Sequence, residues 1–144
     1  MTVKQHPVVA RLKDFCRLWC DRDLETHLSF LSTSRETVMY GTGKDEKRIG
    51  REAIRQQCLR DWAQSDSASI EFKWMTSEGT DSLAWTASDI LIKASIKGQP
   101  IQFEGRLTSL WENENGSWQL VQWHFSLPAA EQEQGQSFPR LLSE

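Results

Sequence analysis

Three side chains in this sequence have the chemistry needed to move a proton in a pocket: His124, Asp89 and Tyr40. An imidazole such as that of His124 exchanges its proton near neutral pH. Asp89 lies in an otherwise apolar stretch, so burial would raise the pKa of its carboxyl. Tyr40 ends a short apolar segment and offers a phenol donor. We predict acid–base catalysis, with Asp89 or His124 as the base and Tyr40 or His124 as the donor to an oxyanion.

Each of these residues also has a structural interpretation. His124 could be a core histidine that is hydrogen-bonded to a neighbour. Asp89 could be an exposed strand residue, and Tyr40 could only pack. The composition of the sequence does not decide between the two interpretations.

A hairpin turn predicts which side chains would share a face with His124. Asn115-Gly116 is a preferred pair for a two-residue type I′ turn, which pairs Glu114 with Ser117 and, further along, Leu107 with His124. One face then gathers small and polar groups beside an aromatic ring, and we predict that it lines a pocket. The side chains of this face on the hairpin include Ser109, Trp111, Gln122, His124 and Ser126. On the preceding strand, Trp85 has the same alternation and extends the face. The opposite face would carry Arg106, Thr108, Leu110, Val121, Trp123 and Phe125.

The elements that position these residues follow from the periodicity of apolar side chains. Apolar stripes predict helices first, and alternating apolar runs separated by turn signals predict an antiparallel meander afterwards. This order favours an α+β fold. The predicted helices are 8–20, a short second helix carrying Leu24, Leu28 and Leu31, and 51–63. The predicted strands are 37–40, 69–79, 82–98, 100–114 and 117–127.

A glycine-rich charged loop, residues 41–50, joins the first strand to the third helix. It does not have the G-x-x-x-x-G-K-[ST] spacing of a phosphate-binding loop, and no parallel βαβ unit follows it. The segment Asp45 to Lys47 is interpreted as a solvated loop tip in preference to a ligand contact. Whether Glu46 faces a pocket or a subunit interface stays open.

The composition limits the classes of function. The chain has 144 residues, 38% hydrophobic and 26% charged, which fits one soluble globular domain. A net charge of −3 argues against nucleic-acid binding, and no apolar run is long enough to span a membrane. Three cysteines in helical patterns fit a reducing cytoplasm. Cys16 and Cys20 are four residues apart, but no second ligand pair follows, so we expect no metal and no cofactor.

Several motifs together resemble the SnoaL-like branch of the NTF2-like superfamily. They are the "GTGKDEKRIG" loop, the Ala-Trp pair at Trp85, the R-x-T of Arg106 and Thr108, and the segment "WQLVQWHFSLP" that contains His124, Ser126 and Pro128. The resemblance implies an NTF2-like cone, in which N-terminal helices pack on a strongly curved antiparallel sheet around an apolar pocket. It also implies a homodimer formed through the outer face of the sheet. We expect one domain over residues 1–128 and a polar tail over 129–144.

Two main functions follow from the resemblance. The first is an enzyme of isomerase, dehydratase or cyclase type that acts on a small apolar molecule. The alternative is a non-catalytic dimeric binding or association module whose pocket holds a small apolar or carboxylate metabolite. A third possibility is an interaction protein whose cone is filled by its own tryptophans. Arg106 would form an ion pair at the dimer interface or contact a substrate.

Overall fold

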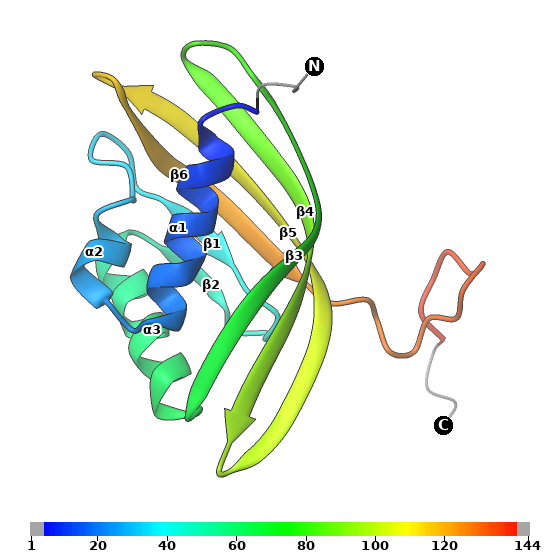
Figure 1. Ribbon diagram of the computed structural model, residues 1–144. Coiled ribbons are helices and arrows are strands. Elements are labelled where there is room, and N and C mark those ends of the chain that lie inside the picture. The colour runs from blue at the N-terminus through cyan, green and yellow to red at the C-terminus, as the bar shows by residue number, and fades with distance from the viewer. Residues whose placement is uncertain (1–4, 141–144) are drawn as a thin grey trace.

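The computed structural model describes residues 5–140 and consists of three helices and one mixed sheet (Figure 1). The helices are α1 (Val8–Cys20), α2 (Leu24–Leu28) and α3 (Arg51–Ala63). The strands are β1 (Val38–Tyr40), β2 (Lys47–Ile49), β3 (Ser67–Gly79), β4 (Leu83–Ile96), β5 (Gln99–Glu114) and β6 (Ser117–Ser126). None of the described helices is long and apolar enough to cross a membrane.

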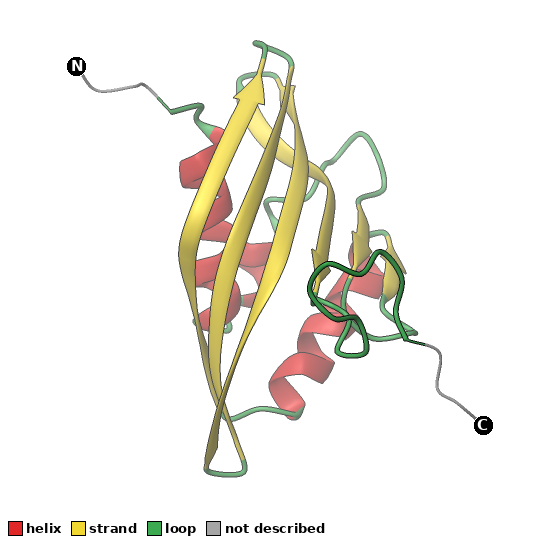
Figure 2. Cartoon of the chain, turned by 90° about the vertical axis from the view of Figure 1, so that its right-hand side faces the viewer, coloured by secondary structure: helices red, strands yellow, loops and turns green. Residues whose placement is uncertain are grey.

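The six strands form one sheet in the order β2-β1-β6-β5-β4-β3. All neighbours are antiparallel except β1 and β6, which run parallel. The long strands β3 to β6 bend around the helices, and the three helices cover the concave face (Figures 1 and 2). The predicted α+β fold with N-terminal helices on a curved sheet is confirmed. Strand β2 was not predicted, because its three residues are highly charged.

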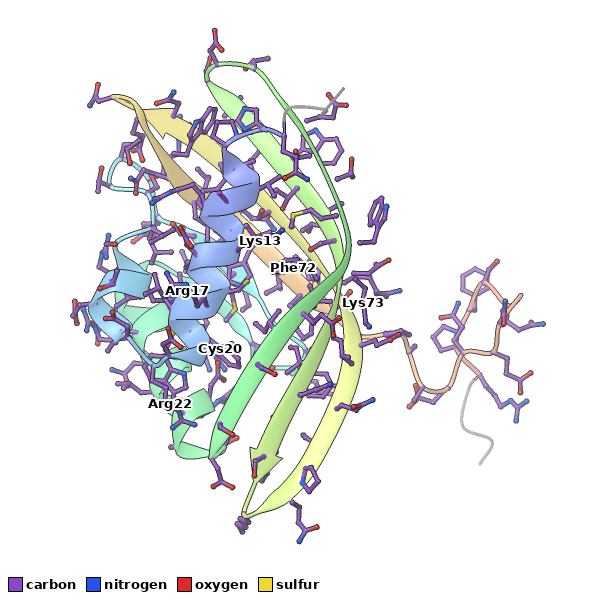
Figure 3. All side chains as sticks on the ribbon, viewed as in Figure 1. Lys13, Arg17, Cys20, Arg22, Phe72 and Lys73 are labelled. Carbon is purple, nitrogen blue, oxygen red and sulfur yellow. The ribbon has the colours of Figure 1, made fainter. Side chains whose placement is uncertain are left out.

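The core lies between α1 and the concave face of the sheet. Leu12 on α1, Leu28 on α2 and Ile54 on α3 are buried against Trp111 and Leu120 of the sheet. On α1, which was predicted over the same residues 8–20, the buried stripe includes Val8, Leu12, Phe15 and Cys16. Figure 3 shows the alternation on β3, where Phe72 lies on the helix side and Lys73 on the solvent side.

Arg22 ties the end of α1 to the end of α3. Its backbone is in the left-handed region, with φ of 60°, and its guanidinium donates to the carbonyl oxygens of Trp62 and Ser65 at 2.9 and 2.8 Å. The side chain extends from the α1–α2 turn toward α3 (Figure 3). This contact fixes the position of the C-terminal end of α3.

The hairpin between β5 and β6 follows the predicted register only near its turn. Asn115 and Gly116 both have positive φ, and Glu114 pairs with Ser117 as predicted. Between Leu110 and Trp111 the register then shifts by one, with Val121 as the extra residue of a β-bulge. Beyond the bulge, the predicted pairing of β5 with β6 is wrong.

The shift reverses the faces of β6. Because side chains alternate between the two faces of a strand, a slip of one residue exchanges them. Leu107 pairs with Phe125 and Ser109 with Trp123, so both aromatic rings point to the helix side. His124 pairs with Thr108 and lies on the outer face.

Residues 127–140 leave the end of β6 as an irregular arm that projects away from the domain (Figures 1 and 2). Its contacts are largely internal: Arg140 donates to the carbonyl oxygen of Glu131 and forms an ion pair with Glu133 at 2.8 Å. Phe138 on the arm is exposed.

Candidate functional site

A cavity of about 320 Å³ lies between the three helices and the concave face of the sheet. Its volume is at the lower end of the range of small-molecule sites. Most of its wall is apolar. The apolar wall residues include Leu12, Phe15, Trp19, Met39, Ile54, Ile70, Ile90, Ile92, Phe103, Leu107, Trp123 and Phe125.

The cavity opens beside the C-terminal end of α3. Of the wall residues, Thr42 and Gln64 on the helix side and Ile96 and Ile101 on the sheet side are exposed. At the other end the wall is made by buried groups such as Leu12 and His27. A molecule in the cavity would therefore have one hydrated end and one buried end.

Gln57 organises the polar part of the wall and is almost fully buried. Its Nε2 donates to Asp61 Oδ1 at 2.7 Å and to Glu46 Oε1 at 2.9 Å. Its Oε1 accepts from Arg48 Nε at 2.9 Å and from an Arg60 nitrogen at 3.3 Å. The two arginines set the orientation of the amide, since only its oxygen can accept from them. Two carboxyls are thus held beside each other by one nitrogen.

Asp61 is the carboxyl with the most perturbed environment on the wall. Burial raises its pKa, and the nearby carboxylate of Glu46 adds to this effect. Hydrogen bonds from Gln57 and from Trp19 Nε1, the latter at 3.2 Å, act in the opposite direction, as does the charge of Arg60. The net result is a carboxyl that holds its proton to higher pH than an ordinary aspartate. Such groups are typical of acid–base sites.

The glycine-rich loop turns Glu46 inward. Glu46 lines the cavity, its side chain is 17% exposed, and its Oε2 accepts from the Gly43 backbone N–H. A Cβ at Gly41 or Gly43 would lie 3.0 or 3.2 Å from Glu46 Cδ, so both glycines leave room for this side chain. The interpretation of the loop as a solvated tip holds for the exposed Asp45, which pairs with Arg60 at 2.6 Å, and is wrong for Glu46.

His27 is the second polar group in the buried part of the wall. It is 2% exposed, and its ring stacks on Phe15 at 3.9 Å between centroids. Its Nδ1 lies 2.9 Å from the Phe15 carbonyl oxygen. A carbonyl only accepts, so Nδ1 carries the hydrogen and Nε2 is left as an acceptor. Burial lowers the pKa of His27 to about 4, and the imidazole is neutral at physiological pH.

Cys16 and Cys58 also line the cavity as free thiols. Burial raises the pKa of both, for Cys58 to about 12, so neither is a thiolate at neutral pH. Within residues 5–140, no group of three His, Cys, Asp or Glu side chains converges as metal ligands would.

The structure does not gather the three predicted catalytic residues around the cavity. Tyr40 contributes to the cavity wall at its exposed edge. His124 is exposed on the outer face of the sheet, with its ring 5.1 Å from that of Tyr40. Asp89 is also exposed there, opposite Arg106. The prediction that the His124 face lines the pocket is wrong, because the bulge at Val121 turns His124 outward.

The predicted ligand-binding residues lie either in the buried core or on the outer face of the sheet. Ser109 and Trp111 face the helices as predicted, but they are buried in the core, where Trp111 Nε1 donates to Ser109 Oγ at 2.7 Å. Gln122 and Ser126 lie on the outer face with His124. Trp85 is 43% exposed on the outer face, opposite Leu110. None of these five residues lines the described cavity.

His27, Glu46, Gln57 and Asp61 were not predicted as site residues from the sequence. A signal for two of them was present. Ile54, Gln57, Cys58 and Asp61 have the spacing i, i+3, i+4 and i+7, which puts them on one helix face. Two polar residues therefore interrupt the apolar stripe of the helix that was predicted over 51–63. His27 and Glu46 lie in short segments where periodicity carries no information.

The sequence model of the SnoaL-like domain matches residues 8–130. The chain belongs to this family. The SnoaL-like assignment agrees with the motifs of the glycine-rich loop and of β6. A comparison with curated proteins found no match.

Solved structures support the SnoaL-like fold. One is a candidate calcium/calmodulin-dependent protein kinase II association domain from Xanthomonas campestris, with 18% identity, coverage of 85% of this chain and 86% of that one, and a TM-score of 0.76. Another is a candidate dehydratase of the NTF2-like family from Streptomyces avermitilis, with 14% identity, 85% and 95% coverage, and a TM-score of 0.76. A Catenulispora acidiphila structure in complex with S-DNPA has 13% identity, 83% and 89% coverage, and a TM-score of 0.69. At these identities the likeness concerns the fold alone.

Proposed function

We propose that this SnoaL-like protein binds a small, largely apolar organic molecule in its cavity and that Asp61 exchanges a proton with it. The observation that carries the proposal is a carboxyl of raised pKa on the wall of an apolar cavity. An apolar pocket with a few convergent polar groups is the usual form of a small-molecule site. The candidate dehydratase among the related folds and the relative with bound S-DNPA fit this proposal.

The proposed roles follow from the hydrogen bonds. Asp61 acts as the acid or base, because its raised pKa moves proton exchange closer to neutral pH. Gln57 is a positioning residue that holds Asp61 and Glu46 together. Tyr40 has no donor role in the proposal, because its ring lies beside that of His124 on the outer face of the sheet. The proposal gives His124 and Asp89 no part in the cavity.

A thermal-shift screen against small metabolites, including ring ketones, amines and carboxylic acids, tests this function. A ligand at 100 times its Kd stabilises the folded state by about 2.7 kcal/mol, which raises the Tm by several degrees. We expect at least one compound class to shift the wild type and to shift Asp61→Asn less. Asp14→Asn, which removes an exposed carboxylate of α1, and His124→Ala are matched controls that should respond as the wild type does.

Turnover of the compound that binds decides whether the protein is an enzyme. Loss of turnover in Asp61→Asn, with binding of the compound retained, would support the acid–base role. If no compound shifts the wild type, or if His124→Ala loses the shift while Asp61→Asn keeps it, the proposed site is wrong.

We also propose that two copies of the chain associate through the outer face of the sheet. Trp74, Trp85 and Leu110 are 54%, 43% and 36% exposed there, on three adjacent strands. Large aromatic side chains gathered on one face are typical of protein interfaces. Arg106 and Asp89 face each other across β5 and β4 in the same area.

Sedimentation velocity at micromolar concentrations tests this association. We expect a dimer for the wild type and a monomer for Trp85→Lys. Leu59→Lys is the matched control, because Leu59 is 44% exposed on α3, away from the sheet. A monomeric wild type, or a dimer that Trp85→Lys leaves intact, would contradict the proposal.

The proposed compartment is a reducing one. The three cysteines, Cys16, Cys20 and Cys58, are free thiols, and Cys16 and Cys58 are buried. Within residues 5–140 they do not converge with other side chains that could bind a metal.

A further inference from the structure

The ionisable groups on the cavity wall carry one sign of charge. Glu46 and Asp61 both line the cavity, and no lysine or arginine of the described part of the chain does. Arg48 and Arg60 do not line the cavity and bind the oxygen of Gln57. Arg60 forms ion pairs with Asp45 and, at 3.8 Å, with Glu46 Oε1. The wall is therefore suited to a neutral or positively charged molecule.

The hydrogen-bond donors beside the carboxyls are already used. The two N–H groups of Gln57 go to Glu46 and Asp61, and the indole N–H of Trp19 goes to Asp61. A carboxylate has about four acceptor sites, so Asp61 has capacity left. A bound molecule would meet acceptors at this place, and it would have to supply the hydrogens itself.

A second acceptor lies deeper in the cavity. Nε2 of the fully buried His27 has no partner among the described residues, because the ring bonds only through Nδ1. His27 contacts Phe15, whereas Asp61 contacts Trp19. Phe15 and Trp19 are one turn apart on α1, so the two acceptors lie at different positions along the cavity.

We propose that the cavity selects an amphipathic amine, with its ammonium group between Asp61 and Glu46 near the opening, its apolar body against the aromatic wall, and a second donor directed to His27. This inference rests on the proposed small-molecule function and names its ligand class. The ammonium supplies the hydrogens that the carboxyls can accept. At the opening it keeps part of its hydration, which limits the cost of removing a charge from water.

A carboxylate ligand does not fit this wall. It would lie beside two carboxyls, with Arg48 and Arg60 bound to the oxygen of Gln57 and no free donor in the polar cluster. A neutral ligand of the same shape would gain the apolar contacts and lose the charge-assisted hydrogen bond. Such a bond is worth about tenfold or more in affinity over a neutral one.

Isothermal titration calorimetry with three probes of equal shape tests the proposal: 2-naphthylmethylamine, 2-naphthylmethanol and 2-naphthoate. We expect the amine to bind the wild type about tenfold more tightly than the alcohol, and the carboxylate to bind most weakly. Asp61→Asn should bring the amine close to the alcohol, whereas Asp14→Asn should keep the preference of the wild type. Should Asp61→Asn fail to fold, Glu46→Gln and the wild-type probe series still decide the question.

A fourth probe, 6-hydroxy-2-naphthylmethylamine, tests the deeper acceptor. It should bind more tightly than the parent amine to the wild type and lose this gain in His27→Phe. If the alcohol binds as tightly as the amine, the selection of amines is wrong while the proposed small-molecule function stands. If the carboxylate binds best, the ligand class is wrong. If none of the probes binds, both the ligand class and the cavity's function are contradicted.

Discussion

Gln57 is the residue on which the polar wall of the cavity depends. Its amide is in contact with two carboxyls and two guanidinium groups, and its replacement would leave all four without this partner. We predict that Gln57→Leu lowers the free energy of unfolding by about 2–4 kcal/mol, because each buried polar group left unsatisfied costs about 1–3 kcal/mol.

Urea unfolding of the variant measures this loss. Gln56→Leu is the matched control, because Gln56 is the exposed neighbour on the same helix and its side chain donates to Glu52, one turn away. Equal stability of the two variants would mean that the amide of Gln57 does not hold the cluster together.

His27 makes the stability of the domain depend on pH. Its pKa is about 4 in the folded protein, against about 6.5 in an unfolded chain. Between these values the unfolded state binds the proton and the folded state does not, so the free energy of unfolding falls as the pH falls. The predicted loss from this group is about 3 kcal/mol at most between pH 7 and 4.

Unfolding by urea at a series of pH values measures this dependence. His27→Gln should flatten the profile between pH 6.5 and 4, and the control His124→Gln, at an exposed position of the outer face, should leave it as in the wild type. A profile that His27→Gln does not change would place the titrating group elsewhere.

At the scale of elements, the bulge at Val121 decides which side chains of β6 reach the cavity. Deleting Val121, the extra residue, would join the two registers, because Leu120 would still pair with Trp111 and Gln122 with Leu110. We predict that the variant folds, since Trp123 and Phe125 would still face the helices and His124 would stay on the outer face. Far-ultraviolet circular dichroism and solubility report the outcome.

Deletion of Gln136 from the irregular arm is the control and should leave folding intact. An unfolded variant lacking Val121 would show that the bend at the bulge, and not only the pairing of β5 with β6, is needed for the fold.

The order of helices and long strands could be predicted from the sequence, because periods of 3.6 and 2 extend over ten or more residues in each element. The pairing near Asn115-Gly116 could be predicted for the same kind of reason, since the turn type sets it locally. The bulge could not, because Val121 and its neighbours are all compatible with a regular strand. That one residue moved His124 out of the predicted site.

The members of the observed polar cluster come from separate segments, and this explains why the sequence did not assemble them. Glu46 comes from the glycine-rich loop, Gln57 and Asp61 from α3, and His27 from a five-residue helix. Their association depends on tertiary packing against α1. Only the pair on α3 had a signal, at i and i+4 on an apolar stripe.

At the scale of the whole molecule, an irregular arm follows the last strand, β6, which ends at Ser126. The contacts of the arm are largely with itself, and the match to the SnoaL-like domain ends at residue 130. We predict that a chain truncated after Pro128 unfolds within about 1–2 °C of the full chain, because few core contacts are lost. Differential scanning calorimetry measures this; a drop of many degrees would show that the arm docks on the domain.

Two alanines stand side by side where the cavity meets solvent. Ala68 of β3 pairs with Ala94 of β4, and both line the wall near the exposed Ile96. Methyl groups at this place leave a window that larger side chains would close. For the proposed ligand, larger side chains at this window would slow entry and exit alike and leave the affinity unchanged. Loss of the carboxyls would instead lower the affinity, mostly through faster dissociation.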